Sequence, residues 1–144
     1  MKTYADTSFL MRLYLTQSDS QKALAFMCDF RDALPFTPLH RHELRNAIRL
    51  AVFRKAIDSE RRKAAFLDID SDLEDGILVH SPISWTNAFR ETEQLGSDHT
   101  ELLGVRGVDL LHVGMARTLG AKHFLTFDLR QADLARACGF NVKF

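Results

Sequence analysis

The sequence lacks the features that disulfide-rich, zinc-finger and membrane-spanning proteins require. It has two cysteines, Cys28 and Cys138, in separate apolar segments without metal-ligand spacing, which argues against a disulfide-rich scaffold or a zinc finger. We expect both thiols to be free and buried. No apolar run approaches the roughly 20 residues of a membrane span, and the first residues lack the apolar core of a signal peptide. We therefore expect a soluble, cytoplasmic protein that contacts no membrane.

An excess of charge is also missing. Lys and Arg together number 19, as do Asp and Glu, so no overall field draws the chain towards nucleic acid or anionic lipid. Any contact with nucleic acid must come from a local patch. Repeats, low-complexity tracts and linkers are absent too. The 144 residues, of which 46% are apolar, suffice for one core, and we expect a single domain over residues 1–144.

Short β-prone segments alternate with helix-like segments along the whole chain. We expect strands over residues 2–5, 35–39, 77–82, 123–127 and 141–144. We expect helices over residues 8–15, 18–34, 41–55, 59–73, 106–119 and 130–139, and a further helix that begins at Trp85 and breaks near Gly96. This alternation predicts an α/β fold, in which a parallel sheet of four to five strands is covered by helices on both faces.

Four acidic residues fall near strand ends or helix starts. Asp6 follows the first strand and Asp128 follows the strand over 123–127, while Glu43 and Asp109 are placed in the first turns of predicted helices. Ligand sites in open parallel sheets lie beyond the carboxyl ends of the strands, so these carboxylates are expected in one crevice. Each could instead cap a helix or favour the positive end of its dipole. Together, they would repel one another unless a cation neutralised them.

The ligand types narrow the choice of cation. All are oxygens, which favours Mg²⁺ or Mn²⁺ over zinc. His40 and His42 lie two residues apart and lack a third ligand at His-Glu-x-x-His spacing, and the acidic segment "DIDSDLEDG" (68–76) is typical of a solvated helix face. A cation held by four carboxylates suits metal-assisted hydrolysis of a phosphodiester, in RNA or in DNA.

Three segments, in order along the chain, resemble PIN-domain ribonucleases, especially the VapC-type toxins of bacterial toxin–antitoxin pairs. They are "ADTSFLMRLYL" (5–15), "HELRNA" (42–47) and "GVDLLHVGMARTLGAKHFLTFDLRQADLARACGFNV" (107–142). The first and last are fairly specific, and the central one is short. The resemblance implies a three-layer α/β/α domain and a Mg²⁺-dependent (or Mn²⁺-dependent) endoribonuclease that hydrolyses RNA.

The resemblance also implies roles for individual residues. The catalytic and metal-binding set would be four acids, Asp6, Glu43, Asp109 and Asp128. Thr7 or Ser8 and Thr126 stand at the family's hydroxyl positions, where they would orient a carboxylate or a metal-bound water. Many relatives carry a further acid near the fourth, and the nearest here is Asp133. It could be a metal ligand or simply an early residue of the last helix.

Two further features allow a functional and a structural interpretation. His112 lies three residues after Asp109 on the same helical face, where it could hold a carboxylate, approach RNA or pack in the core. Arg41, Arg45 and Arg49 fall four residues apart. Their stripe could guide RNA, bind an acidic partner or remain solvated.

The resemblance extends to partners. It implies a homodimer and a small antitoxin protein whose segment covers the crevice, with an Arg that could stand among the carboxylates. Two alternatives share the same residues. One is a PIN nuclease that processes RNA without being a toxin. The other is a binding module whose acidic crevice receives a basic peptide and catalyses nothing.

Overall fold

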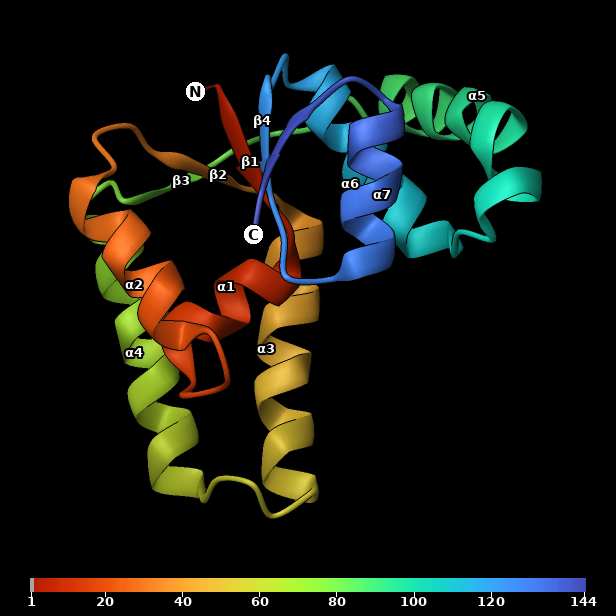
Figure 1. The fold of residues 1–144 in the computed structure, drawn as a ribbon. Helices are drawn as coiled ribbons and strands as arrows, with labels where there is room; N and C mark the ends of the chain where they lie inside the picture. The colour runs from red at the N-terminus through yellow and green to blue at the C-terminus, as the bar shows by residue number, and fades with distance from the viewer. Residues whose placement is uncertain (1) are drawn as a thin grey trace. The chain divides into compact units, whose positions relative to one another are not determined.

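The fold is α/β. The computed structural model describes residues 2–144, which contain seven helices and five strands (Figure 1). They group into two compact units. One comprises the described residues up to Asp6 together with Pro82–Phe144, and the other comprises Thr7–Ser81. Every strand pairing in the two units is parallel, which confirms the predicted α/β class. The five strands form one sheet of three and one of two, however, and not the single sheet of four to five strands that was predicted.

The first unit is built on a three-stranded sheet. Strands β1 (Thr3–Ala5), β4 (His123–Leu125) and β5 (Asn141–Lys143) pair in the order β1-β4-β5. Helices α5 (Trp85–Leu103), α6 (Gly107–Thr118) and α7 (Leu129–Ala137) contact one another, and α7 also contacts β5. Ala5 is the register partner of Leu125. Because β1 and β4 run parallel, the residues that follow them leave the sheet at the same edge.

Aromatic side chains fill the core of this unit. The ring of Tyr4 stacks on Phe124 with 5.4 Å between centroids, and Phe124 meets Phe140 edge-on. His112, on α6, is 3% exposed, and its Nδ1 lies 2.7 Å from the Tyr4 hydroxyl in a hydrogen bond. His112 is therefore a packed and hydrogen-bonded core residue, which was one of its predicted alternatives.

The second unit contains four helices and a two-stranded sheet. The strands are β2 (Leu34–Phe36) and β3 (Leu78–His80). The helices are α1 (Thr7–Tyr14), α2 (Ser20–Asp29), α3 (Pro38–Phe53) and α4 (Ser59–Glu74), and α1 contacts the other three. Helices α3 and α4 form an antiparallel pair joined by a short turn (Figure 1). Buried apolar residues from α1, α3 and α4 form the core, among them Phe9, Leu44, Ile48 and Ile69.

Helix α3 begins earlier than predicted. The strand expected over 35–39 ends at Phe36, and Thr37 caps the helix. The His40 backbone N–H donates to Thr37 Oγ1 over 3.3 Å, and the Thr37 N–H donates to His40 Nδ1 over 3.0 Å. Pro38 then takes the first helical position, where its missing N–H costs nothing. Glu43 consequently lies in the second turn of the helix, not in the first.

Helix α5 does not break at Gly96 as predicted. It continues to Leu103 and ends at Gly104, whose φ of 65° is left-handed. Leu95 is buried, and a Cβ built on Gly96 would lie 3.5 Å from Leu110 Cδ1 on α6. Packing against α6 therefore outweighs the low helix propensity of glycine.

Gly114 on α6 packs closely against α5. A Cβ there would lie 2.1 Å from Thr92 Oγ1 and 3.2 Å from the Ala88 carbonyl oxygen. We expect Gly114→Ala to lower the free energy of unfolding by about 1–2 kcal/mol, because overpacking outweighs the helix-propensity gain. Urea denaturation measures this change. Gly107→Ala on the same helix is the control, since its Cβ would meet nothing within 4 Å.

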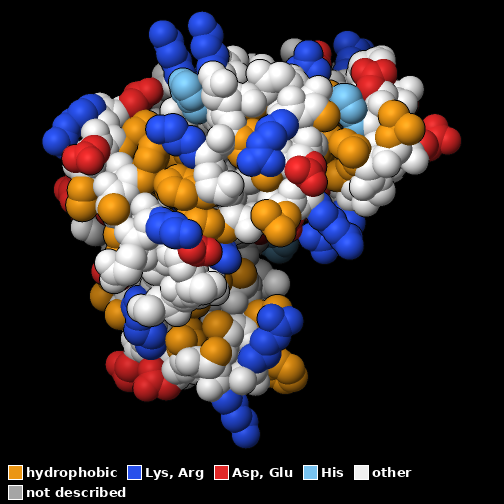
Figure 2. Space-filling model, viewed as in Figure 1, with side chains coloured by type: hydrophobic (Ala, Val, Ile, Leu, Met, Phe, Trp, Pro, Cys, Tyr) orange, Lys and Arg blue, Asp and Glu red, His pale blue; other side chains and the backbone are white. Residues whose placement is uncertain are grey.

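Three smaller findings concern the surface. Both cysteines are free as expected, but Cys28 is exposed and Cys138 is half-buried, because only one face of each helix reaches the core. Figure 2 shows positive and negative side chains interspersed on the face in view, consistent with the balanced composition. No helix within residues 2–144 is both long and apolar enough to cross a membrane.

Candidate active site at the edge of the three-stranded sheet

Asp6 and Thr126 meet where β1 and β4 end. The Thr126 hydroxyl donates a 2.5 Å hydrogen bond to Asp6 Oδ2, and the Asp6 backbone N–H donates to the Leu125 carbonyl oxygen. Asp6 is 4% exposed and Thr126 is fully buried. A buried carboxylate needs donors that stabilise its charge, and this hydroxyl is one of them.

Asp128 makes hydrogen bonds through both its side chain and its backbone N–H at the start of α7. Its Oδ1 accepts the Gln131 backbone N–H over 3.0 Å, so Asp128 is the N-cap of the helix. Its own backbone N–H donates to Thr126 Oγ1 over 3.0 Å. Thr126 therefore links the two acids: its hydroxyl donates to Asp6 and accepts from Asp128.

Asp109 is joined to Asp128 through an arginine. Arg106 Nε donates to Asp109 Oδ2 over 3.1 Å, and Arg106 Nη2 lies 4.0 Å from Asp128 Oδ2. The Asp109 side chain is 16% exposed and that of Asp128 is 35% exposed, so both can be reached from solvent. In the first unit, the guanidinium of Arg106 therefore lies next to both Asp109 and Asp128. Thr126 links Asp6 to Asp128.

Glu43 and Thr7 form a pair in the second unit. Thr7 Oγ1 donates to Glu43 Oε1 over 2.8 Å, and both side chains are partly exposed. Thr7 is the residue that follows Asp6 in the chain. The backbone carbonyl of Ser8 accepts a hydrogen bond from Arg12. Thr7, one of the two predicted hydroxyl positions after Asp6, is therefore hydrogen-bonded to a predicted metal ligand.

Two other predicted groups have structural contacts. Asp133 is exposed on α7 and lies 3.5 Å from Arg136 Nη1.

Arg45 donates to Asp70 Oδ1 over 2.8 Å, and the guanidinium groups of Arg45 and Arg49 lie over the Phe66 ring. Burial, followed by repulsion from Arg41, lowers the pKa of the Arg45 guanidinium. Arg45 and Arg49 thus help to pack α3 against α4, and an RNA or partner contact for the stripe stays a prediction.

The donor set of the first unit fits a hard divalent cation. Asp6, Asp109 and Asp128 offer carboxylate oxygens, the ligand type that Mg²⁺ and Mn²⁺ prefer. The guanidinium of Arg106 shows that a positive group is accommodated between two of these carboxylates. As the side chains stand, no three His, Cys, Asp or Glu residues within 2–144 are gathered closely enough to hold a metal ion.

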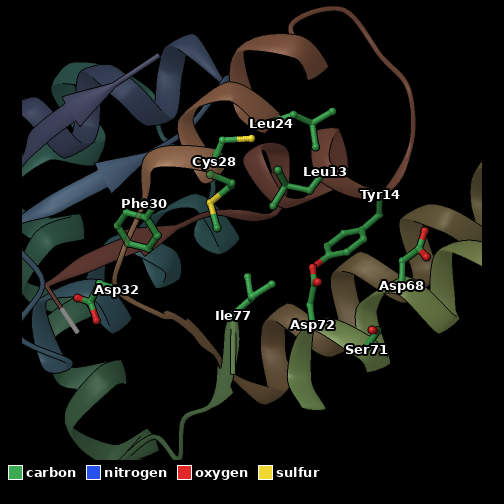
Figure 3. A pocket seen from close by; sticks show the side chains of 11 residues that line it. Leu13, Tyr14, Leu24, Cys28, Phe30, Asp32, Asp68, Ser71, Asp72 and Ile77 are labelled. Atoms are coloured by element: carbon green, nitrogen blue, oxygen red, sulfur yellow. The ribbon is translucent and has the colours of Figure 1, made fainter. Parts of the chain in front are cut away.

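A cavity of about 450 Å³ lies elsewhere, in the second unit among α1, α2 and α4 (Figure 3). Its lining is mostly apolar and includes Leu13, Leu24, Met27, Phe30 and Ile77, with the acids Asp32, Asp68 and Asp72. The Tyr14 hydroxyl points at Asp72 and donates to its Oδ2 over 2.6 Å. No residue of the predicted site, all of which lie within 2–144, lines this cavity.

The cavity changes the interpretation of the acidic segment 68–76. Burial raises the pKa of the Tyr14 hydroxyl and of the Asp72 carboxyl, and Asp70 is paired with Arg45. The segment is therefore partly engaged in contacts, not only solvated as predicted. The Tyr14–Asp72 pair could not be predicted, because Tyr14 falls within an ordinary apolar helical run. For Arg106 there was a usable signal: it precedes Asp109 by three residues at a helix start.

Comparisons with known proteins support the fold. No protein-family model matches the chain, and no curated protein matches it. The solved structure of Mycobacterium tuberculosis VapC20, described as a toxin that cleaves the sarcin-ricin loop, is similar with a TM-score of 0.69 and 17% identity, covering 99% of both chains. FitAcB from Neisseria gonorrhoeae is similar with a TM-score of 0.64 and 14% identity, covering 99% of this chain and 96% of that one.

These similarities define the class of fold. The chain has the α/β fold of VapC-type PIN domains, as the resemblance of its three motifs predicted. The likeness covers nearly the whole of each chain, so the fold accounts for both compact units.

Proposed function

We propose that this protein is a Mg²⁺-dependent endoribonuclease that acts in the cytoplasm as the toxin of a toxin–antitoxin pair. The observation that carries the proposal is the linkage of Asp6 and Asp128 through Thr126 at the carboxyl ends of β1 and β4. A buried hydroxyl that donates to the Asp6 carboxylate and also accepts the Asp128 backbone N–H is more than capping of α7 requires. The fold shared with an RNA-cleaving toxin adds support for the class of substrate.

The residues of the proposed site have different roles in holding the cation. Asp6, Asp109 and Asp128 would hold the cation, and Thr7 orients Glu43, the fourth predicted acid. Mg²⁺ or Mn²⁺ held there supplies the activation of water and the stabilisation of the leaving oxygen in phosphodiester hydrolysis. Thr126 keeps the Asp6 carboxylate in place, and the N-cap bond through Oδ1 fixes the Asp128 side chain, whose Oδ2 lies 4.0 Å from Arg106 Nη2.

Partners follow from the same proposal. We propose an RNA substrate, a cognate antitoxin protein and a second copy of this chain in a homodimer. The accessible carboxylates of Asp109 and Asp128 support the antitoxin, since they already accept one guanidinium and would accept that of a partner's Arg.

Incubation with RNA is the direct test of the proposal. Wild-type protein with Mg²⁺ should cut total cellular RNA into discrete fragments, and excess chelator should reduce cleavage to background because the cation supplies the chemistry. Gel electrophoresis followed by sequencing of fragment ends measures this. Restoring Mg²⁺ in excess of the chelator should restore the same fragments. Cleavage that persists in chelator would contradict the metal site.

Two rival functions give different results. An RNA-processing nuclease would show the same metal dependence, but its expression would leave cell growth unchanged, whereas a toxin would arrest growth. A binding module is favoured by the apolar cavity with its acidic side chains Asp32, Asp68 and Asp72, which suits a basic amphipathic segment. That rival predicts no cleavage of RNA by folded protein under any metal condition.

A further inference from the structure

Arg106 stands at the junction of two predicted metal ligands. It precedes the first residue of α6 and therefore occupies the N-cap position, but its side chain makes no capping hydrogen bond. The guanidinium instead reaches Asp109 Oδ2 at 3.1 Å and approaches Asp128 Oδ2 at 4.0 Å. One positive group thus faces the oxygens of two acids on different helices.

The oxygens involved are carboxylate oxygens, the ligand type that a hard divalent cation prefers. Asp128 Oδ1 already accepts the Gln131 backbone N–H, so Oδ2 is the atom directed at a cation. In Asp109 it is likewise Oδ2 that accepts the Arg106 Nε–H. A guanidinium and a divalent cation that approach the same two oxygens repel each other, and the two states exclude one another.

The exposure of Arg106 allows its contact with Asp109 and Asp128 to break and re-form. The Arg106 side chain is 70% exposed, so it can turn into solvent at little cost when a metal arrives. A guanidinium is always protonated in proteins, so Arg106 presents a positive charge to both Asp109 and Asp128. An exposed ion pair of this kind is weak, and this weakness leaves metal binding possible.

We propose that Arg106 is a built-in competitor of the divalent cation: it neutralises Asp109 and Asp128 when the metal is absent and must leave them when the metal binds. This inference rests on the proposed function, because it assumes that these acids hold a metal. Arg106 would then set the metal concentration at which the enzyme becomes active. A purely structural role, a surface pair that stabilises the start of α6, would involve Asp109 alone and would not alter the affinity for metal.

Titration of the protein with Mn²⁺, without RNA, tests the proposal. Free Mn²⁺ is followed by its electron paramagnetic resonance signal in wild type, Arg106→Met and Arg106→Lys. We expect Arg106→Met to bind Mn²⁺ about two- to fivefold more tightly, the range that corresponds to loss of an exposed ion pair. Arg106→Lys should lie between the two, since an ammonium keeps the charge but not the fork that spans both acids.

A matched control separates direct competition from a general effect of charge. Arg117→Met removes a positive charge from the last turn of the same helix, where Arg117 pairs with Glu91, an acid outside the proposed metal set. Its Mn²⁺ affinity should equal that of wild type. An affinity of Arg106→Met equal to or weaker than that of wild type would overturn the proposal and leave the proposed nuclease intact. Absence of any Mn²⁺ binding, in wild type and variants alike, would overturn both.

Discussion

Asp6→Asn should lower RNA cleavage by on the order of a thousandfold, because it removes one charged ligand and with it several kcal/mol of metal-based stabilisation of the transition state. Asparagine has the same shape as aspartate, and its carbonyl oxygen can still accept the Thr126 hydroxyl that now donates to Oδ2. The variant should therefore fold. Cleavage rates with saturating Mg²⁺, together with a circular dichroism melt, measure both expectations.

The control for Asp6→Asn is Asp29→Asn, an equal change of charge at the exposed end of α2. It should cleave RNA like wild type. If Asp6→Asn kept more than a tenth of wild-type activity while folded, Asp6 would be a structural acid and the proposed site would lose its central ligand. If neither wild type nor variant cleaved RNA but both folded proteins bound a basic peptide, the binding module would replace the nuclease.

The elements that were predicted well are those whose signals are local. The strand at 123–127 is rich in aromatic and β-branched residues, and the observed β4 (His123–Leu125) falls within it. Gly120, with a φ of 73°, ends α6 where a left-handed residue was expected. Two of the elements whose bounds differ from the prediction depend on longer-range or side-chain contacts. Thr37 and His40 start α3 through a reciprocal cap, and contact with α6 carries α5 past Gly96.

Some contacts of the candidate site could likewise be predicted from the sequence, and others could not. Asp6 and Thr126 are 120 residues apart, yet their proximity follows from two parallel strands that end together, and a strand-end argument can anticipate it. The contact of Arg106 with Asp109 could be inferred from their spacing, but its approach to Asp128 could not, because it depends on how the N-terminal ends of α6 and α7 face each other. Likewise the pairing of Tyr14 with Asp72 depends on the packing of α1 against α4, which no spacing in the sequence encodes.

Thr126→Val should weaken Mn²⁺ binding by about 10- to 100-fold, the range expected when a residue that orients a metal ligand is lost. Valine matches threonine in shape, so the buried site stays filled, but the hydroxyl between Asp6 and Asp128 disappears. The buried Asp6 carboxylate loses a donor and the Asp128 backbone N–H loses its acceptor. We therefore also expect the free energy of unfolding to fall by about 1–3 kcal/mol.

Thr126→Ser distinguishes loss of the hydroxyl from loss of packing, because it restores Oγ and removes only a methyl group. If Thr126 positions Asp6, Thr126→Ser should recover most of the Mn²⁺ affinity, although its stability stays below that of wild type. Mn²⁺ titration and urea unfolding of the three proteins give these two quantities separately. Equal metal affinity in Thr126→Val and wild type would mean that the hydroxyl serves the fold alone, since a group that orients a ligand must alter binding when it is removed.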